Sequence, residues 1–148
     1  MLLSVAHPAA AQVEDVTDPT FGTITVTPQT VDATNADATL TLTVDVTDDL
    51  SGIRSVSGRT ISPAGPDRSI SLIRTQGQQG DLSTQWEATI TIPQYSATGT
   101  WQIQLSAQDL VGNTTPLTTK TTFTTTGTAD TTDPTFGTIT VTPQTVDA

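Results

Sequence analysis

The stretch that decides the fold is ATLTLTVDV, residues 38 to 46. In an extended chain, successive side chains point to opposite faces. One face of this stretch therefore carries only aliphatic side chains, which are Leu40, Leu42, Val44 and Val46, and the other face carries threonines and Asp45. Alternation of this kind is typical of a strand that is buried on one side. The stretch predicts such a strand, and with it a core that the strand must face.

The same period of two recurs on both sides of this strand, with turn residues about every ten positions. It predicts six further strands, over Phe21–Thr27, Ile53–Ser62, Ser69–Arg74, Thr84–Ile92, Thr100–Asp109 and Leu117–Thr126. Near Ser55 the alternation shifts, which indicates a β-bulge. Trp86 and Trp101 fall on apolar faces, so we expect them in the core and not on a sugar-stacking surface. The pattern predicts an all-β protein, an antiparallel sandwich of about seven strands.

The composition supports this fold class and excludes several functions. Of the 148 residues 35 are threonine, a β-branched type that favours strands over helices. Cysteine is absent and the single histidine is His7, which excludes thiol nucleophiles, Cys or His zinc sites and histidine-dependent triads from the folded part. The net charge of −10 disfavours nucleic acid and anionic lipid as partners. We therefore expect no enzyme activity and no catalytic residues.

A long internal repeat organises the chain. Residues 17–33 and residues 132–148 both read TDPTFGTITVTPQTVDA, at an offset of 115 positions. Such a period fits one independently folding domain. We expect a domain over 15–126, a short linker over 127–134, and the first strand of a next, truncated repeat over 135–148. The expected partners are neighbouring repeats of the same chain, and the isolated chain should be a monomer.

The N-terminal segment carries a hint of export. Residues 1–14 begin with a short apolar run, which an A-x-A-like site follows, and this is the pattern at the end of a secretory signal. We interpret the segment as a signal-peptide remnant or, alternatively, as a disordered tail. No stretch of the sequence approaches the roughly 20 apolar residues of a membrane-spanning helix. The expected location is extracellular.

Several short runs resemble the bacterial immunoglobulin-like repeats of secreted and surface proteins. They are the linker DTTDP at 130–134, VDVTDDLSGI at 44–53, the segment from Ile92-Pro93 to Gly99-Thr100-Trp101, and AQDLVGNT at 107–114. The resemblance covers about residues 15–126. It implies an immunoglobulin-like sandwich, and a role as a spacer, an adhesive module or an accessory unit beside a catalytic domain.

Acidic turns are the main candidate site. Loops from alternate strand ends gather at opposite poles of a sandwich, so Asp48 and Asp49 should meet Asp109 at one pole. The linker with Asp130 and Asp133 follows the last strand at the other pole. These two residues would therefore meet the pole of the next domain that corresponds to Asp48 and Asp109. Carboxylates are ligands for Ca²⁺, and the resemblance implies calcium at such junctions, although none is required for folding. The simpler interpretation is that Asp48 and Asp109 accept backbone N–H groups within tight turns.

Two functions remain open at this point. The first is a structural or adhesive repeat, a stalk or spacer of a large bacterial surface protein, which the repeated sequence favours. The alternative is a carbohydrate- or protein-binding accessory module attached to a secreted enzyme or adhesin. That alternative requires exposed aromatic side chains, for which Trp86, Trp101 and Tyr95 are the candidates.

Overall fold

A computed structural model describes residues 11–142 of the chain. Most of the expected signal remnant, residues 1–10, and the end of the expected next strand, residues 143–148, lie outside the described residues.

Residues 11–142 form nine strands and no helix, which makes the fold all-β. The strands are β1 (Thr20–Thr27), β2 (Thr30–Asp32), β3 (Ala38–Thr47), β4 (Ile53–Ile61), β5 (Arg68–Ile70), β6 (Ile73–Gln76), β7 (Ser83–Ile92), β8 (Gly99–Asp109) and β9 (Thr118–Thr126). In this part of the chain there is accordingly no helix long and apolar enough to cross a membrane.

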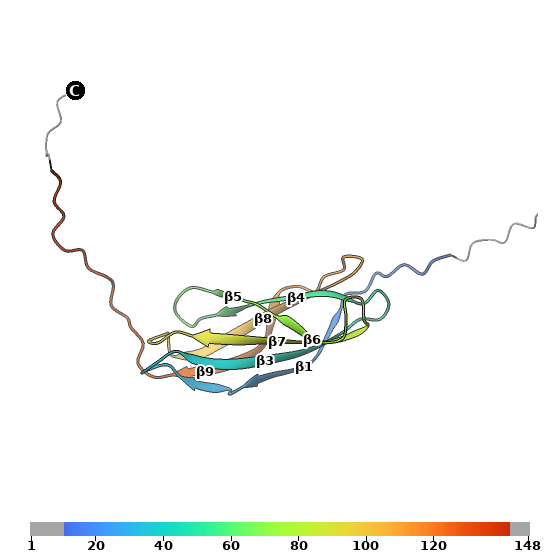
Figure 1. The fold of residues 1–148 in the computed structure, drawn as a ribbon, viewed down its shortest axis with the longest axis horizontal. Coiled ribbons are helices and arrows are strands. Elements are labelled where there is room, and N and C mark those ends of the chain that lie inside the picture. Colours follow the sequence, from blue (N-terminus) through green and yellow to red (C-terminus); the bar gives the residue numbers. More distant parts are fainter. Residues whose placement is uncertain (1–10, 143–148) are drawn as a thin grey trace, which may run out of the picture.

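The strands make two sheets that face one another (Figure 1). One sheet has four strands in the order β1-β3-β7-β6, and the other has five in the order β2-β9-β8-β4-β5. Neighbouring strands are antiparallel except β2 and β9, which run parallel over Thr30–Asp32 and Thr124–Thr126. The expected mainly antiparallel two-sheet arrangement is confirmed.

The core lies between the two sheets and is built from the faces that alternation predicts. In β3 the four side chains Leu40, Leu42, Val44 and Val46 are all buried, while the residues between them are partly exposed. Trp86 and Trp101 retain only 7% and 2% of their exposure, so both are core residues, as expected. The Trp101 ring stacks on Phe123 of β9 with 5.7 Å between ring centroids. These contacts join β8 to β9 inside the five-stranded sheet.

Two details of the expected strand plan are wrong. Ser69–Arg74 is not one strand: β5 pairs with β4 in one sheet, and β6 pairs with β7 in the other. The chain changes sheets between them, at Ser71 and Leu72, and the Leu72 side chain packs against the core. The second difference is β2, which the sequence pattern does not predict. With only three residues, this strand is too short to show alternation. The predicted bulge is confirmed by a register shift between Ile53 and Ser55.

The two ends of the sandwich carry different loops. We call the end with loops 48–52 and 110–114 and the incoming segment 12–18 the N-terminal pole. The opposite end, with loops 33–37 and 93–98, is the C-terminal pole, from which the chain leaves after β9. Figure 1 shows the chain entering and leaving at opposite ends of the long axis.

Candidate functional site

The first half of the candidate site is the turn that follows β3. Asp48 accepts hydrogen bonds from the backbone N–H of Gly52 at 2.7 Å and of Leu50 at 3.3 Å. Gly52 has φ +84°, and a Cβ there would lie 2.0 Å from the Gly80 carbonyl oxygen, so only glycine fits. The DDLSG sequence thus folds into a tight turn that holds the Asp48 carboxylate at the end of the sandwich.

The second half is the turn that follows β8. Asp109 is completely buried. Its Oδ1 accepts from the N–H groups of Gly112 and Asn113 at 2.6 and 2.8 Å, and its Oδ2 accepts from Asn113 Nδ2 at 2.6 Å. The two turns are also bonded together, since Leu110 N–H donates to the Gly52 carbonyl at 3.0 Å. The simpler interpretation of both aspartates, as acceptors within tight turns, is therefore confirmed.

A third aspartate, Asp15 of the incoming segment, docks against both turns. Its Oδ2 accepts from Ser51 N–H at 2.9 Å, and its carbonyl oxygen accepts from Asn113 Nδ2 at 3.3 Å. One carboxylate oxygen each from Asp15, Asp48 and Asp109 lies within 4.8 Å of the others. The Ser51 side chain and then the Thr17 backbone amide, by hydrogen bonding, lower the pKa of Asp15.

The structure brings together only part of the predicted metal set. Asp48 and Asp109 meet as expected. Asp49 is exposed and instead accepts a hydrogen bond from the Thr17 hydroxyl. Asp130 lies at the C-terminal pole, where its N–H donates to the Tyr95 carbonyl at 3.0 Å. Asp133 is exposed and makes no side-chain hydrogen bond within the described part of the chain.

Sequence reasoning missed Asp15, although a signal for it exists. Asp15 stands 115 positions before Asp130, so it is the same position in the preceding copy of the repeat. The sequence prediction placed Asp130 against the first pole of a following domain. Asp15 occupies that place in the domain of this chain.

Chemically, the cluster offers carboxylate oxygens and little else. Ca²⁺ takes 6–8 oxygen ligands, and most oxygens of this cluster already accept hydrogen bonds from the protein. The Asp48 Oδ1 atom is the exception, because it is buried and has no hydrogen-bond partner among the described residues. In this arrangement, hydrogen bonds of Asp15 fix the incoming segment to the loops that contain Ser51 and Asn113.

Arginine side chains outside this cluster also have structural partners. Arg74 stacks over the Trp86 ring at 4.6 Å and donates to the Arg54 carbonyl at 3.0 Å. Arg59 lies 3.7 Å from Asp67 in a half-exposed ion pair. Tyr95 is 48% exposed at the C-terminal pole and adopts φ +62°. Comparison with known proteins adds no further candidate: no protein-family model matches the chain, and no curated protein matches it.

Proposed function

We propose that this chain is a structural repeat, with an immunoglobulin-like sandwich as its unit, from a large bacterial secreted or cell-surface protein. Its role is that of a stalk or adhesive spacer and not that of an enzyme. The observation that carries the proposal is the position of the two sequence copies. The same sequence enters the sandwich at the N-terminal pole and leaves it at the C-terminal pole (Figure 1).

This position determines how successive copies would be arranged. Units that are joined end to end through opposite poles extend along one line instead of folding back. The intervening linker is short and contains Pro134, which restricts its backbone. A strand of 11 residues, such as β8, spans about 36 Å. Each added repeat should therefore lengthen the molecule by at least that distance, to which the linker adds its own length.

The alternative function, a binding module for carbohydrate or protein, has less support. Trp86 and Trp101 are both buried, so they offer no flat surface to a sugar ring. Tyr95 is half exposed, but its carbonyl oxygen already binds the outgoing linker. Within the sandwich, residues 20–126, Tyr95 is the one exposed aromatic side chain, and one ring falls short of the platform that the alternative requires.

The test is a length series. Because residue 148 is equivalent to residue 33, the chain can be extended after Ala148 by one or two further copies of residues 34–148 without a break in the repeat. Small-angle X-ray scattering should show the maximum dimension rising by a constant increment with each copy. A compact particle, whose dimension hardly rises when a copy is added, would refute the spacer function.

A further inference from the structure

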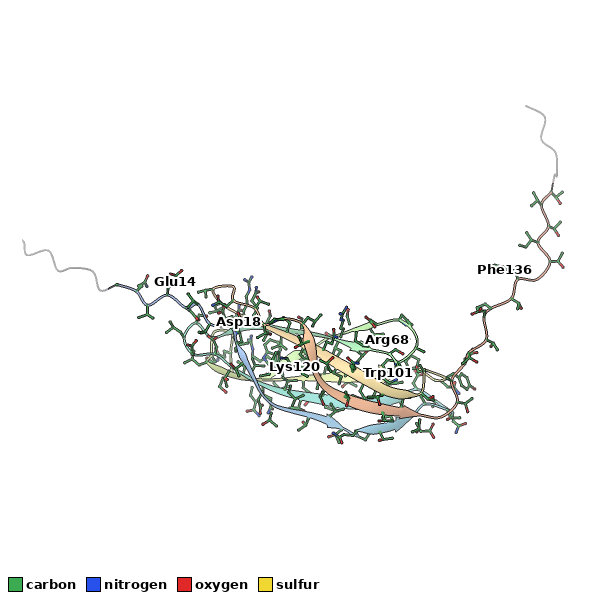
Figure 2. The ribbon with its side chains drawn as sticks, turned by 180° about the vertical axis from the view of Figure 1, so that it is seen from behind. Glu14, Asp18, Arg68, Trp101, Lys120 and Phe136 are labelled. Carbon is green, nitrogen blue, oxygen red and sulfur yellow. The ribbon has the colours of Figure 1, made fainter. Side chains whose placement is uncertain are left out.

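The two poles of the sandwich bind the same repeat position through different atoms. At the C-terminal pole, the backbone N–H of Asp130 donates to the Tyr95 carbonyl at 3.0 Å. At the N-terminal pole, the side chain and carbonyl oxygen of Asp15 accept from Ser51 N–H and Asn113 Nδ2. Figure 2 shows Glu14 and Asp18, which flank Asp15, at one end of the sandwich, and Phe136 beyond the other. In an array of repeats, each linker would contain one such aspartate, which follows one domain as Asp130 does and precedes the next as Asp15 does.

The local hydrogen bonds of this aspartate are the same at both poles. Asp15 Oδ1 accepts from the N–H and the hydroxyl of Thr17, both at 3.1 Å. Asp130 Oδ1 accepts from the same two groups of Thr132, at 2.9 and 2.7 Å. This Asp-x-Thr turn therefore forms whether or not the N-terminal pole of a domain is present to receive it. A linker that already has its docked conformation loses less entropy when it docks.

The two sets of contacts do not compete for atoms. The N–H group binds the preceding domain, Oδ1 closes the local turn, and Oδ2 and the carbonyl oxygen bind the following domain. The residue at x is Val16 in one copy and Thr131 in the other, but no bond of the turn uses its side chain. All of these contacts can thus be made by one residue at once.

Both poles also offer apolar side chains next to this position. Leu50 and Val111, which line the groove beside Asp15, are 48% and 62% exposed. Tyr95, which lines a groove with Asp130 at the C-terminal pole, is 48% exposed. Poles that share one bonded residue would bring these side chains near one another and remove part of their apolar surface from water.

From these observations we propose that the linker aspartate is hydrogen-bonded to both neighbouring domains at once, so that the junction between repeats is rigid. The interaction surface is the N-terminal pole around Ser51 and Asn113, and its partner is Asp130 of the preceding repeat. This inference rests on the proposed function as a repeat, and it adds a property that a flexible string of domains would lack.

The experiment uses the complete chain extended after Ala148 by its own residues 34–148. Because the chain contains no cysteine, Thr122→Cys can be introduced in each sandwich at an exposed site of β9 for spin labels. Pulsed electron paramagnetic resonance then gives the distribution of distances between the two domains. The variants are Asp130→Ala and the matched control Asp133→Ala, which removes the same charge from the same linker. Six Gly/Ser residues inserted after Thr128 provide a flexible reference.

We expect a narrow distribution for the unaltered two-repeat protein and for Asp133→Ala, and for Asp130→Ala a broad one that approaches the flexible reference. An unaltered protein as broad as the reference would overturn the rigid junction. So would an Asp130→Ala variant as narrow as the unaltered protein. The proposed function fails separately, because a side-by-side arrangement of domains would shorten the mean distance whatever the width.

A second measurement needs no substitution and covers the case in which Asp130→Ala fails to fold. Amide hydrogen exchange of Asp130 is compared between the 148-residue chain and the two-repeat protein. Bonds from a second domain should hold the linker more firmly and raise the protection of this amide several-fold. Equal protection in the two proteins would overturn the proposal.

Discussion

Two regions of this molecule share one sequence and differ in structure. Residues 20–27 form strand β1, which pairs with β3 along the edge of the four-stranded sheet. Residues 135–142 have the same sequence and form no strand. Val26 is 5% exposed in the first copy, whereas its counterpart Val141 is 65% exposed in the second. Phe136 is 93% exposed, whereas its counterpart Phe21 packs against the core.

The difference separates what is local from what the rest of the fold supplies. The Asp-x-Thr turn appears in both copies, because its donors and acceptor lie within three residues. The strand appears only where the edge of β3 is available, since an extended segment needs a partner for its backbone groups. The same aspartate and threonine thus form the turn by themselves, whereas the same strand residues form a strand only together with β3.

The largest expected effect on stability comes from comparing two variants that carry the same substitution, one in each copy. Val26→Asp places a carboxylate at a buried position of β1 and should lower the free energy of unfolding by about 3 kcal/mol. Val141→Asp changes an exposed side chain and should alter it by less than about 0.5 kcal/mol. Urea unfolding measures both. Equal losses would mean that the second copy is also part of the folded structure.

A smaller effect is expected from the linker aspartates. Asp15→Ala and Asp130→Ala each remove one Asp-x-Thr turn, but only Asp15→Ala removes the bond to Ser51. We therefore expect the thermal midpoint of the sandwich to fall for Asp15→Ala and to stay unchanged for Asp130→Ala. Scanning calorimetry of the two variants beside the unaltered chain provides the measurement. A fall of the same size in both would assign the stability to the turn instead of the docking.

The pH dependence of stability should likewise differ between Asp15 and Asp130. Hydrogen bonding lowers the pKa of Asp15, and for Asp130 the Thr132 side chain and then its backbone amide do the same. A carboxyl whose pKa is lower in the folded state stabilises that state above its unfolded pKa, and this stability is lost as the pH falls below about 4. Asp15→Ala should therefore make the acid loss of stability shallower.

For Asp130→Ala we expect an acid profile like that of the unaltered chain, because the Asp130 carboxylate accepts hydrogen bonds only from Thr132 within its own turn. Urea midpoints between pH 7 and pH 2 would measure these profiles. A profile for Asp15→Ala that runs parallel to that of the unaltered chain would contradict the assignment.

Calcium offers a further comparison between the two copies. Asp15 lies beside Asp48 and Asp109, whereas Asp130 has neither neighbour in this chain. Added at millimolar concentration, Ca²⁺ should shift the NMR signals of Asp15 and its neighbours and leave those of Asp130 in place. Asp48→Asn should abolish the shift. Equal shifts at Asp15 and Asp130 would indicate nonspecific attraction to negative charge.

The smallest expected effect is exchange of the two copies between molecules. Residues 135–142 of one molecule can replace β1 of another, because the contacts with β3 would be the same. The tethered β1 has the higher effective concentration, so oligomers should form slowly and only in concentrated solution. Light scattering should show more oligomer for the whole chain than for a chain ending at Thr128. Phe136→Asp should remove the excess, and an excess that survives this substitution would have another origin.

Sequence patterns predict the long strands well and the short connections poorly. In β3, β7 and β8 each inner face is set by alternation over ten or eleven residues, so the predicted ends lie within one residue of those observed. Alternation predicts one strand where β5 and β6 form two, because three- and four-residue segments carry too little periodicity to show where the chain changes sheets.

The site follows the same rule. The meeting of Asp48 and Asp109 is a consequence of strand order, and it was predicted. The contact between Asp15 and Ser51 lies outside the strands, where alternation says nothing. Only the 115-residue repeat, which makes Asp15 the equivalent of Asp130, points to it.

The parallel pairing of β2 with β9 determines how the domain would respond to a pulling force. Thr30–Asp32 lies along Thr124–Thr126, and further bonds from Thr124 to Gln29 and from Ala33 to Thr126 extend the contact. Tension applied at the two poles draws these segments along each other in opposite directions. The hydrogen bonds between them are then loaded in shear, together, instead of opening one after another. The three residues of β2, which stand out least in the sequence, are therefore placed to bear mechanical load.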